Sequence, residues 1–170
     1  MNTALIRPEG EFTVGATQAP FVVAQHFHEA SKVLQSMRVK ITTLGAWFKR
    51  IFLEMTEPAH EAMKISYARL TQDASLNEII AALGGEDHLA MPIETVFRLL
   101  EKQGKGQQEG VLLADQETNK FFVKDGKGTL RTIDCYWTGY RWKVLVFVME
   151  RGDLVFGDRR LFYRSSEVKA

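Results

Sequence analysis

The sequence predicts an α+β protein with a helix-rich N-terminal half that contains short strands, followed by a C-terminal antiparallel β-meander of about five strands. Three observations support this prediction. Apolar residues recur at helical spacing before residue 104, the apolar period changes to two after Gly110, and turn sequences divide the second part into short segments. We expect residues 1–104 to form an α/β region and residues 110–165 to form the meander, with the two packed together as one unit.

In the N-terminal region, helices are expected where the sequence carries an amphipathic stripe. They are 28–35, 46–55, 79–83 and a helix that begins after Pro92 and ends before Gly104. Ser75 and Glu78 have the spacing of a capping box, which predicts the start of the third of these helices. Strands are expected at 21–23, 38–43 and 64–70, and a short helical turn at 56–58. The first 20 residues are expected to form a tail or a strand added to another element.

In the C-terminal region, strands are expected at 111–114, 120–124, 129–137, 142–149 and 161–163. The sequence Asp125-Gly126-Lys127-Gly128 is typical of a tight hairpin turn. Residues 142–149 carry apolar side chains on both faces, which predicts a central strand that is covered on both sides. The segment 104–110 contains several glycines, but it follows a helix and lacks the residues that end a phosphate-binding loop, so we interpret it as a linker.

The composition is that of an ordinary globular domain, with 170 residues of which 45% are hydrophobic and 25% charged. The single cysteine, Cys135, excludes an intramolecular disulfide. The N-terminus lacks the features of a signal peptide, and the apolar runs are far shorter than the ~20 residues that span a bilayer. We therefore expect a cytoplasmic protein that binds neither a membrane nor a cofactor.

Short motifs of core and turn residues occur throughout residues 38–165. They include Val39-Lys40-Ile41, Trp47-Phe48-Lys49, Tyr67-Ala68-Arg69-Leu70-Thr71, Ala82-Leu83-Gly84-Gly85-Glu86, Phe121-Phe122-Val123-Lys124-Asp125 and Trp137-Thr138-Gly139-Tyr140-Arg141-Trp142. In these motifs the chain resembles a group of uncharacterised proteins from small-genome, candidate-phylum bacteria. The group has Trp-Gly near its last turn, where this chain has Phe156-Gly157. The resemblance implies one folded unit and brings no activity, cofactor or catalytic residue.

Two kinds of residue in the sequence could bind a metal ion or act as a catalytic group. His26 and His28 would lie on one face of a strand, where they could share a metal ion, but on a helix they would point apart. Two partly exposed histidines are the favoured interpretation. Cys135 alternates in phase with Ile133 and Trp137, which predicts a buried side chain and not a nucleophile.

The C-terminal region interleaves aromatic and basic residues, and residues 118–170 hold eleven Lys or Arg against six Asp or Glu. The predicted binding surface consists of Trp137, Tyr140, Arg141, Trp142, Lys143, Arg159 and Arg160. Bases that stack on aromatic rings and phosphates that meet Lys or Arg are how proteins hold single-stranded nucleic acid. A sheet also needs aromatic residues for its own core and charges for its exposed face.

The favoured function is therefore a non-catalytic binding or adaptor domain, which contacts a protein partner or a copy of itself through the aromatic face of its C-terminal sheet. One alternative is a module that binds single-stranded nucleic acid with the same surface. A second alternative is a metal-dependent hydrolase built on His26 and His28. An enzyme is the less favoured class, because no acid, base and nucleophile occur at a recognised spacing.

Overall fold

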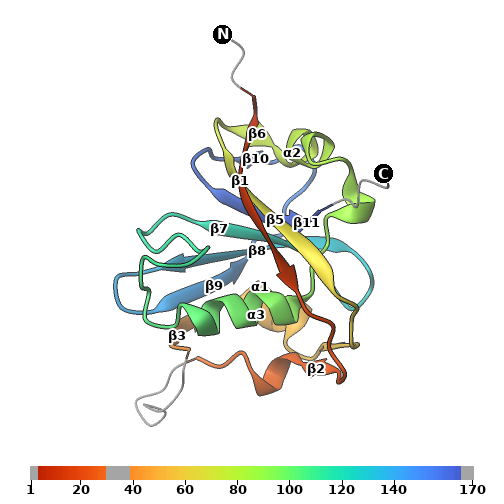
Figure 1. Cartoon of the computed structure of the whole chain (residues 1–170), viewed down its shortest axis with the longest axis vertical. Coiled ribbons are helices and arrows are strands. Elements are labelled where there is room, and N and C mark those ends of the chain that lie inside the picture. The colour runs from red at the N-terminus through yellow and green to blue at the C-terminus, as the bar shows by residue number, and fades with distance from the viewer. Residues whose placement is uncertain (1–3, 30–38, 166–170) are drawn as a thin grey trace.

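In the computed structural model, which describes residues 4–29 and 39–165, the main feature is a seven-stranded mixed sheet (Figure 1). In spatial order its strands are β1 (Ile6–Val14), β5 (Met63–Leu70), β11 (Arg160–Arg164), β7 (Asn119–Lys124), β8 (Leu130–Trp137), β9 (Trp142–Val146) and β3 (Ile41–Leu44). The pairs β11–β7 and β9–β3 are parallel, and the other neighbours are antiparallel. Strands from both ends of the chain are therefore mixed within one sheet.

The predicted fold class is wrong in two respects. The described residues form only three α-helices, α1 (Ala46–Phe52), α2 (Leu76–Ala82) and α3 (Ile93–Lys102), so the first half is not rich in helix. The C-terminal strands do not form a meander either, because β11 lies between β5 and β7 and not beside β9. Alternation along a sequence indicates that a segment is a strand, but it does not indicate which distant strand lies next to it.

Three local predictions are also corrected. The segment predicted as a helical turn contains β4 (Thr56–Glu57), which pairs with β2 (Phe21–Val22). The predicted strand at 111–114 is a loop, whose backbone is held by side-chain amides: Leu112 N–H donates to Gln103 Oε1 at 2.8 Å, and Leu113 N–H donates to Asn119 Oδ1 at 2.8 Å. The predicted helix at 28–35 falls mainly outside the described residues.

Several local signals are confirmed. Ser75 and Glu78 form the predicted capping box at the start of α2. The turn between β7 and β8 is held by Asp125, whose Oδ1 accepts hydrogen bonds from the amides of Lys127 at 2.9 Å and Thr129 at 3.0 Å. The first residues form the edge strand β1, and β9 lies between β8 and β3 as a strand with two neighbours.

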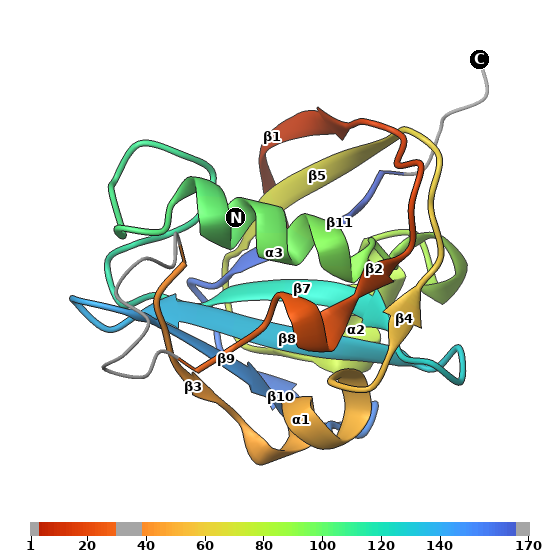
Figure 2. The same cartoon turned by 90° about the horizontal axis from the view of Figure 1, so that it is seen from below.

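Helices and short strands cover both faces of the sheet. On one face lie α1, α3 and the 3-10 turn η1 (Val23–Gln25) with the β2–β4 pair, as Figure 2 shows. The other face is covered by α2 and the small sheet of β6 (Ala74–Ser75) and β10 (Leu154–Val155), next to the 3-10 turn η2 (Glu86–His88). Burying each large apolar side chain contributes roughly 1.5–3 kcal/mol, so these two clusters supply most of the driving force for folding.

None of the helices within 4–29 and 39–165 has the length and the apolar character that a bilayer crossing requires.

Candidate ligand-binding cavity

A cavity of about 320 Å³ lies between the end of β1 and the helix α3, and it opens to solvent on one side. Its apolar lining comes from Phe12 and Val14 on β1 and from Leu99 on α3. Its remaining lining residues are polar or glycine: Thr13, Gly15, Thr17, His60, Glu94, Thr95, Arg98 and Lys102. This volume is at the lower end of the range for small-molecule sites in proteins.

The helix α3 presents two different faces, and this explains how the cavity forms. Ile93, Val96 and Leu100 are completely buried and fix the helix against the sheet. Thr95 and Leu99, which are one turn apart, lie on the flank of this stripe and line the cavity. One face of α3 therefore packs in the core, and the adjacent face forms part of the cavity wall.

The N-terminus of α3 is held by a carboxylate from β4. Glu57 accepts hydrogen bonds from the amide of Ile93 at 2.8 Å and from the amide of Glu94 at 3.2 Å, where the N-cap residue Pro92 offers no side-chain acceptor. Burial raises the pKa of the Glu57 carboxyl, although the two amide hydrogen bonds and the nearby His60 act in the opposite direction. By binding these two amides, Glu57 holds the N-terminal end of α3, which forms one wall of the cavity.

His60 is positioned by three hydrogen bonds. Its backbone N–H donates to Thr17 Oγ1 at 3.0 Å, and its carbonyl accepts from the amide of Thr17 at 2.9 Å. On the ring, Nδ1 lies 2.9 Å from the carbonyl oxygen of Glu61. The imidazole is therefore held in one orientation by the segment that follows β1 and by its own neighbour in the chain.

Two buried polar atoms that belong to lining residues of this cavity have no hydrogen-bond partner among the described residues. They are Thr95 Oγ1 and His60 Nε2. Thr95 is only 3% exposed, and buried polar groups are paired in the great majority of cases. Three other hollows in the described ranges, under α2, beside α1 and along β1, have no such atom in their lining. The cavity between β1 and α3 is therefore the candidate functional site.

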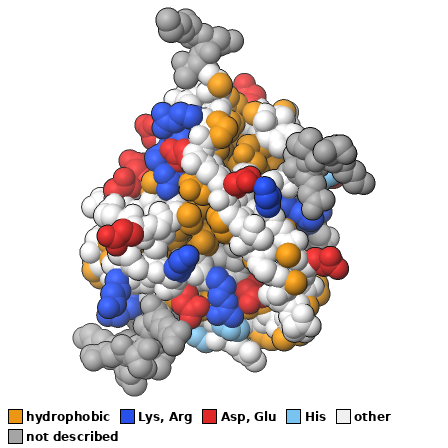
Figure 3. All heavy atoms as spheres, in the orientation of Figure 1, with side chains coloured by type: hydrophobic (Ala, Val, Ile, Leu, Met, Phe, Trp, Pro, Cys, Tyr) orange, Lys and Arg blue, Asp and Glu red, His pale blue; other side chains and the backbone are white. Residues whose placement is uncertain are grey.

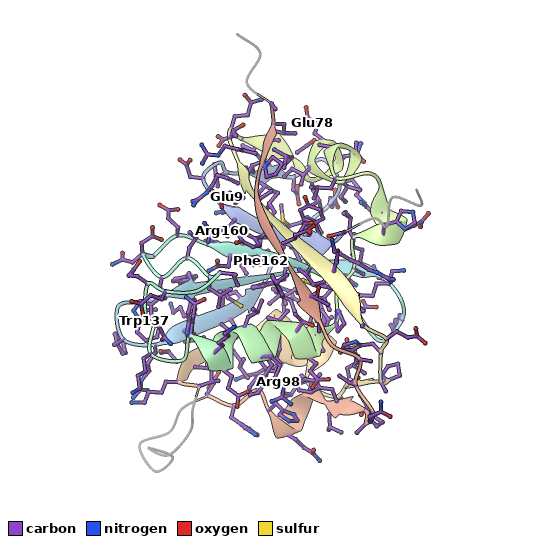
Figure 4. The ribbon with its side chains drawn as sticks, in the orientation of Figure 1. Glu9, Glu78, Arg98, Trp137, Arg160 and Phe162 are labelled. Carbon is purple, nitrogen blue, oxygen red and sulfur yellow. The ribbon has the colours of Figure 1, made fainter. Side chains whose placement is uncertain are left out.

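The mouth of the cavity is charged. Arg98 projects from α3 (Figure 4) and binds Glu94 at 3.2 Å and Glu101 at 3.0 Å. Lys102 is exposed and has no ion pair within the part of the chain that the structure describes. Figure 3 shows Lys and Arg side chains close to Asp and Glu side chains over α3, so neither sign dominates this face.

The structure separates the residues of the predicted binding surface. Trp137 and Trp142 are 8% and 0% exposed and pack against each other in the core, where Trp142 Nε1 donates to the carbonyl of Gln103 at 2.9 Å. Arg160 is half-buried, and its Nε donates to Glu9 Oε2 at 2.7 Å. Figure 4 shows Trp137 and Arg160 in separate parts of the sheet.

The other members of the predicted surface lie nearer to solvent. Tyr140 is 65% exposed in the β8–β9 turn, and the guanidinium of Arg141 lies over its ring at 5.9 Å from the centroid. Lys143 lies over the ring of Tyr136, and Arg159 lies over the ring of Phe156. Of the predicted set, Tyr140, Arg141 and Lys143 thus remain together near one turn, and whether they bind a partner stays a prediction.

The two histidines and the cysteine that the sequence offered as candidates are held within the fold. His26 Nδ1 lies 3.0 Å from the carbonyl of Val22, with its ring stacked on Phe21, and His28 Nε2 lies 3.0 Å from the carbonyl of Gln25. No group of three potential metal ligands occurs among residues 4–29 and 39–165. Cys135 is completely buried, as its alternation predicted, and burial followed by the charge of Asp134 raises its pKa well above the usual range of a thiol.

The sequence contained little sign of the cavity. His60 belongs to no recognised motif, and Thr95 sits beside an apolar stripe without any motif around it. One sequence feature could have indicated it: Thr95, Leu99 and Lys102 recur at helical spacing and, with Arg98, give α3 a second face that carries apolar, hydroxyl and basic side chains. The strand that completes the cavity, β1, is far away in the sequence.

Comparisons of the chain with protein-family models, with curated proteins and with solved structures found no match.

Proposed function

We propose that this protein is a binding protein that takes a small ligand in the cavity between β1 and α3. The observation that carries the proposal concerns Thr95 Oγ1 and His60 Nε2: both atoms are buried, neither has a hydrogen-bond partner among the described residues, and both belong to residues that line the same cavity. An unpaired buried polar atom costs free energy, which a ligand with matching groups recovers on binding.

The shape and the lining of the cavity support the same proposal. Phe12, Val14 and Leu99 provide an apolar surface, and a small number of oriented polar groups is typical of ligand sites. Hydrogen bonds that His60 makes with Thr17 and Glu61 hold its side chain in place, so little conformational freedom is lost when a ligand binds. Water would occupy a polar cavity of this size in the free protein, and a ligand that reproduces its hydrogen bonds would displace it.

The substitution Thr95→Val tests the proposal, because it replaces the hydroxyl with a methyl group of the same shape. No hydrogen bond to a described residue is lost, so the free energy of unfolding should stay unchanged or rise by up to about 1 kcal/mol. Binding should weaken about fivefold, since one hydrogen bond to the ligand disappears. A purely structural threonine would instead lower the stability when it is changed.

The measurement is a thermal-shift screen of wild-type and Thr95→Val protein with small phenols, alcohols, amides, amines and organic acids at millimolar concentration. A compound that binds only the folded state raises the melting temperature, and the rise grows with the ratio of its concentration to its dissociation constant. We expect at least one chemical class to stabilise the wild type and to stabilise the variant less. The proposal is wrong if no compound stabilises the wild type, or if every effect is the same in the variant.

A second candidate function is the adaptor function expected from the sequence, and one observation favours it. Four large apolar side chains in the segment 147–156, which connects β9 to β11, are about half exposed. They are Phe147 (53%), Val148 (46%), Leu154 (53%) and Phe156 (58%). Apolar side chains that gather on one exposed segment are typical of a surface that contacts another protein. Concentration-dependent self-association, or loss of a partner when these residues are changed, would support this candidate.

A further inference from the structure

We infer that the cavity between β1 and α3 receives an apolar side chain of an extended peptide segment, which pairs as an added antiparallel strand with the free edge of β1. This inference rests on the proposed binding function and names the class of ligand. It is carried by the position of β1 at the edge of the sheet, by the direction of its main-chain groups, and by the face of the sheet on which the cavity lies.

The two edges of the seven-stranded sheet differ. At one edge lies β3, where Glu29 forms a parallel bridge with Ile41 and also accepts a hydrogen bond from the amide of Leu44 at 3.0 Å. At the other edge lies β1, and Figure 2 shows no described strand beyond it. A sheet edge with unpaired main-chain groups is where an extended segment of another chain can add a strand.

The hydrogen bonds of β5 show which of its residues face β1. Leu70 N–H donates to the carbonyl of Arg159, just before β11, at 2.9 Å. The carbonyl of Lys64 accepts from the amide of Ser165, just after β11, at 3.0 Å. Main-chain groups point to alternate sides along a strand, so the even-numbered residues of β5 face β11 and the odd-numbered residues face β1.

The same alternation identifies the free groups of β1. The residues opposite the odd-numbered positions of β5 are Gly10, Phe12 and Val14, and these are therefore the residues that bond to β5. Glu11 and Thr13, which are both exposed, direct their N–H and C=O groups toward the free edge. An added antiparallel strand would exchange a pair of hydrogen bonds with each of these two residues.

The first half of β1 is closed to such pairing. Pro8 has no N–H, and the register of β1 shifts between Pro8 and Gly10. Proline and bulges are devices with which native proteins protect an edge strand. The residues from Gly10 to Val14 contain neither a proline nor a further register shift, so this window remains open.

The cavity lies where a partner in this window would place a side chain. Phe12 and Val14 pack against the core on the α3 face of the sheet, and both line the cavity. No lining residue comes from β5, so the cavity lies beside β1 away from the middle of the sheet. In an added strand, the residue opposite Phe12 has its side chain on the same face as Phe12. That side chain would enter the cavity and contact Leu99 of α3.

The charges around the window favour an uncharged segment. The carboxylate of Glu11 binds Lys64 at 2.8 Å, so this part of the edge carries no net charge. The charged side chains on the exposed side of α3 also sum to zero: Glu94, Arg98, Glu101 and Lys102. A charged partner would gain little from such a surface, whereas the apolar lining favours a large apolar side chain.

The test uses capped five-residue peptides that have threonine at every position except the middle one, which is leucine, phenylalanine or alanine. Binding is followed by NMR with the full-length, isotope-labelled wild-type protein. We expect the leucine and phenylalanine peptides to bind about tenfold more tightly than the alanine peptide, because they bury more apolar surface. Their binding should shift the amide signals of Glu11 and Thr13.

A modified peptide tests the main-chain pairing without any change in the protein. In the leucine peptide, methyl groups on the backbone nitrogens of the residues before and after the leucine remove the donors to the carbonyls of Glu11 and Thr13. This peptide should bind about tenfold more weakly than the unmodified one.

Two variants of the protein assign the same contact. Thr13→Pro removes the outward N–H and should weaken binding of the leucine peptide about fivefold. Thr13→Val keeps the N–H and is the matched control, with unchanged affinity. The methylated peptide gives an independent result if the proline variant does not fold.

The outcomes separate this inference from the proposed function. If compounds of the thermal-shift screen bind but no peptide does, the inferred peptide is wrong while the cavity remains a binding site. Equal binding of the three peptides, or no effect of methylation, would also overturn the inferred pairing. If the measured mass doubles with concentration and Thr13→Pro abolishes this, the edge pairs with a second copy and the inferred partner is wrong. If neither peptides nor compounds bind, both the inference and the proposed function are wrong.

Discussion

The residue Glu57 stabilises the protein through two backbone contacts although its surroundings disfavour its charge. Its carboxylate accepts from the amides of Ile93 and Glu94, while burial raises its pKa above the ordinary value of 4.5. A carboxyl with a raised folded-state pKa binds protons more readily in the folded protein than in the unfolded chain. Its contribution to stability is therefore fully present below about pH 4.5 and is lost as the pH rises through its folded-state pKa.

The substitution Glu57→Gln should remove this pH dependence. We expect the variant to become more stable relative to wild type as the pH rises from 4 to 7, because only the wild type loses the contribution of Glu57 over this range. Urea unfolding at four pH values in this range measures the difference. Glu61→Gln, at an exposed neighbouring glutamate, is the matched control and should show no such trend. A constant difference between Glu57→Gln and wild type, or a trend of opposite sign, would contradict the assignment.

The sequence predicted the burial of a single residue correctly only where the local apolar pattern determines the environment of that residue. The burial of Cys135 follows from its phase with Ile133 along β8, and the burial is observed. Trp142 was assigned to a binding surface, but its phase with Val144 and Val146 places it in the core. Thr95 could not be identified, because its missing hydrogen bond becomes visible only when β1 and α3 are placed together.

At the scale of elements, the loop that follows α3 depends on a glycine. Gly106 has a φ of +62°, and a Cβ at this position would overlap with the indole of Trp137. Gly139, in the β8–β9 turn, has a φ of +103°, but a Cβ there would meet no atom within 4 Å. The two glycines thus share a left-handed backbone and differ in what lies beside them.

We predict that Gly106→Ala destabilises the protein more than Gly139→Ala. The positive φ costs about 1–2 kcal/mol at each position, and the overlap with Trp137 should add about 1–3 kcal/mol at Gly106 alone. Thermal unfolding measures both effects, because 1 kcal/mol corresponds to roughly 2–4 °C for a chain of this size. Equal losses in the two variants would mean that the Trp137 ring moves aside freely.

Elements that depend on local chemistry were the ones that the sequence predicted correctly. The capping box of Ser75 and the hairpin turn at Asp125 involve residues within a few positions of each other, so their geometry follows from the sequence itself. The predicted strand at 111–114 failed for the opposite reason. The backbone there is bound by side chains of Gln103 and Asn119, and no periodicity reveals such contacts.

At the scale of the whole molecule, the strand order was beyond prediction from pattern alone. The strand β5 pairs with β1 on one side and with β11 on the other, and β11 follows β5 by about ninety residues. The parallel pairs β11–β7 and β9–β3 depend on connections that run over the faces of the sheet. The cavity lies at the end of β1, which only this long-range order brings against α3.

The apolar segment 147–156 leads to the last prediction, which concerns the molecule as a partner of other chains. If this segment is a contact surface, the measured mass of the wild type should rise with concentration, or the protein should retain a partner on purification. The double substitution Phe147→Ser and Phe156→Ser should abolish that behaviour at little cost in stability, because both rings are more than half exposed. Trp47→Ser removes an aromatic ring of similar exposure from α1 and serves as the control. Light scattering from micromolar to millimolar protein distinguishes the cases. A wild type that stays monomeric and retains no partner would show that the segment 147–156 is not a contact surface, because scattered exposed apolar residues are normal on a monomer.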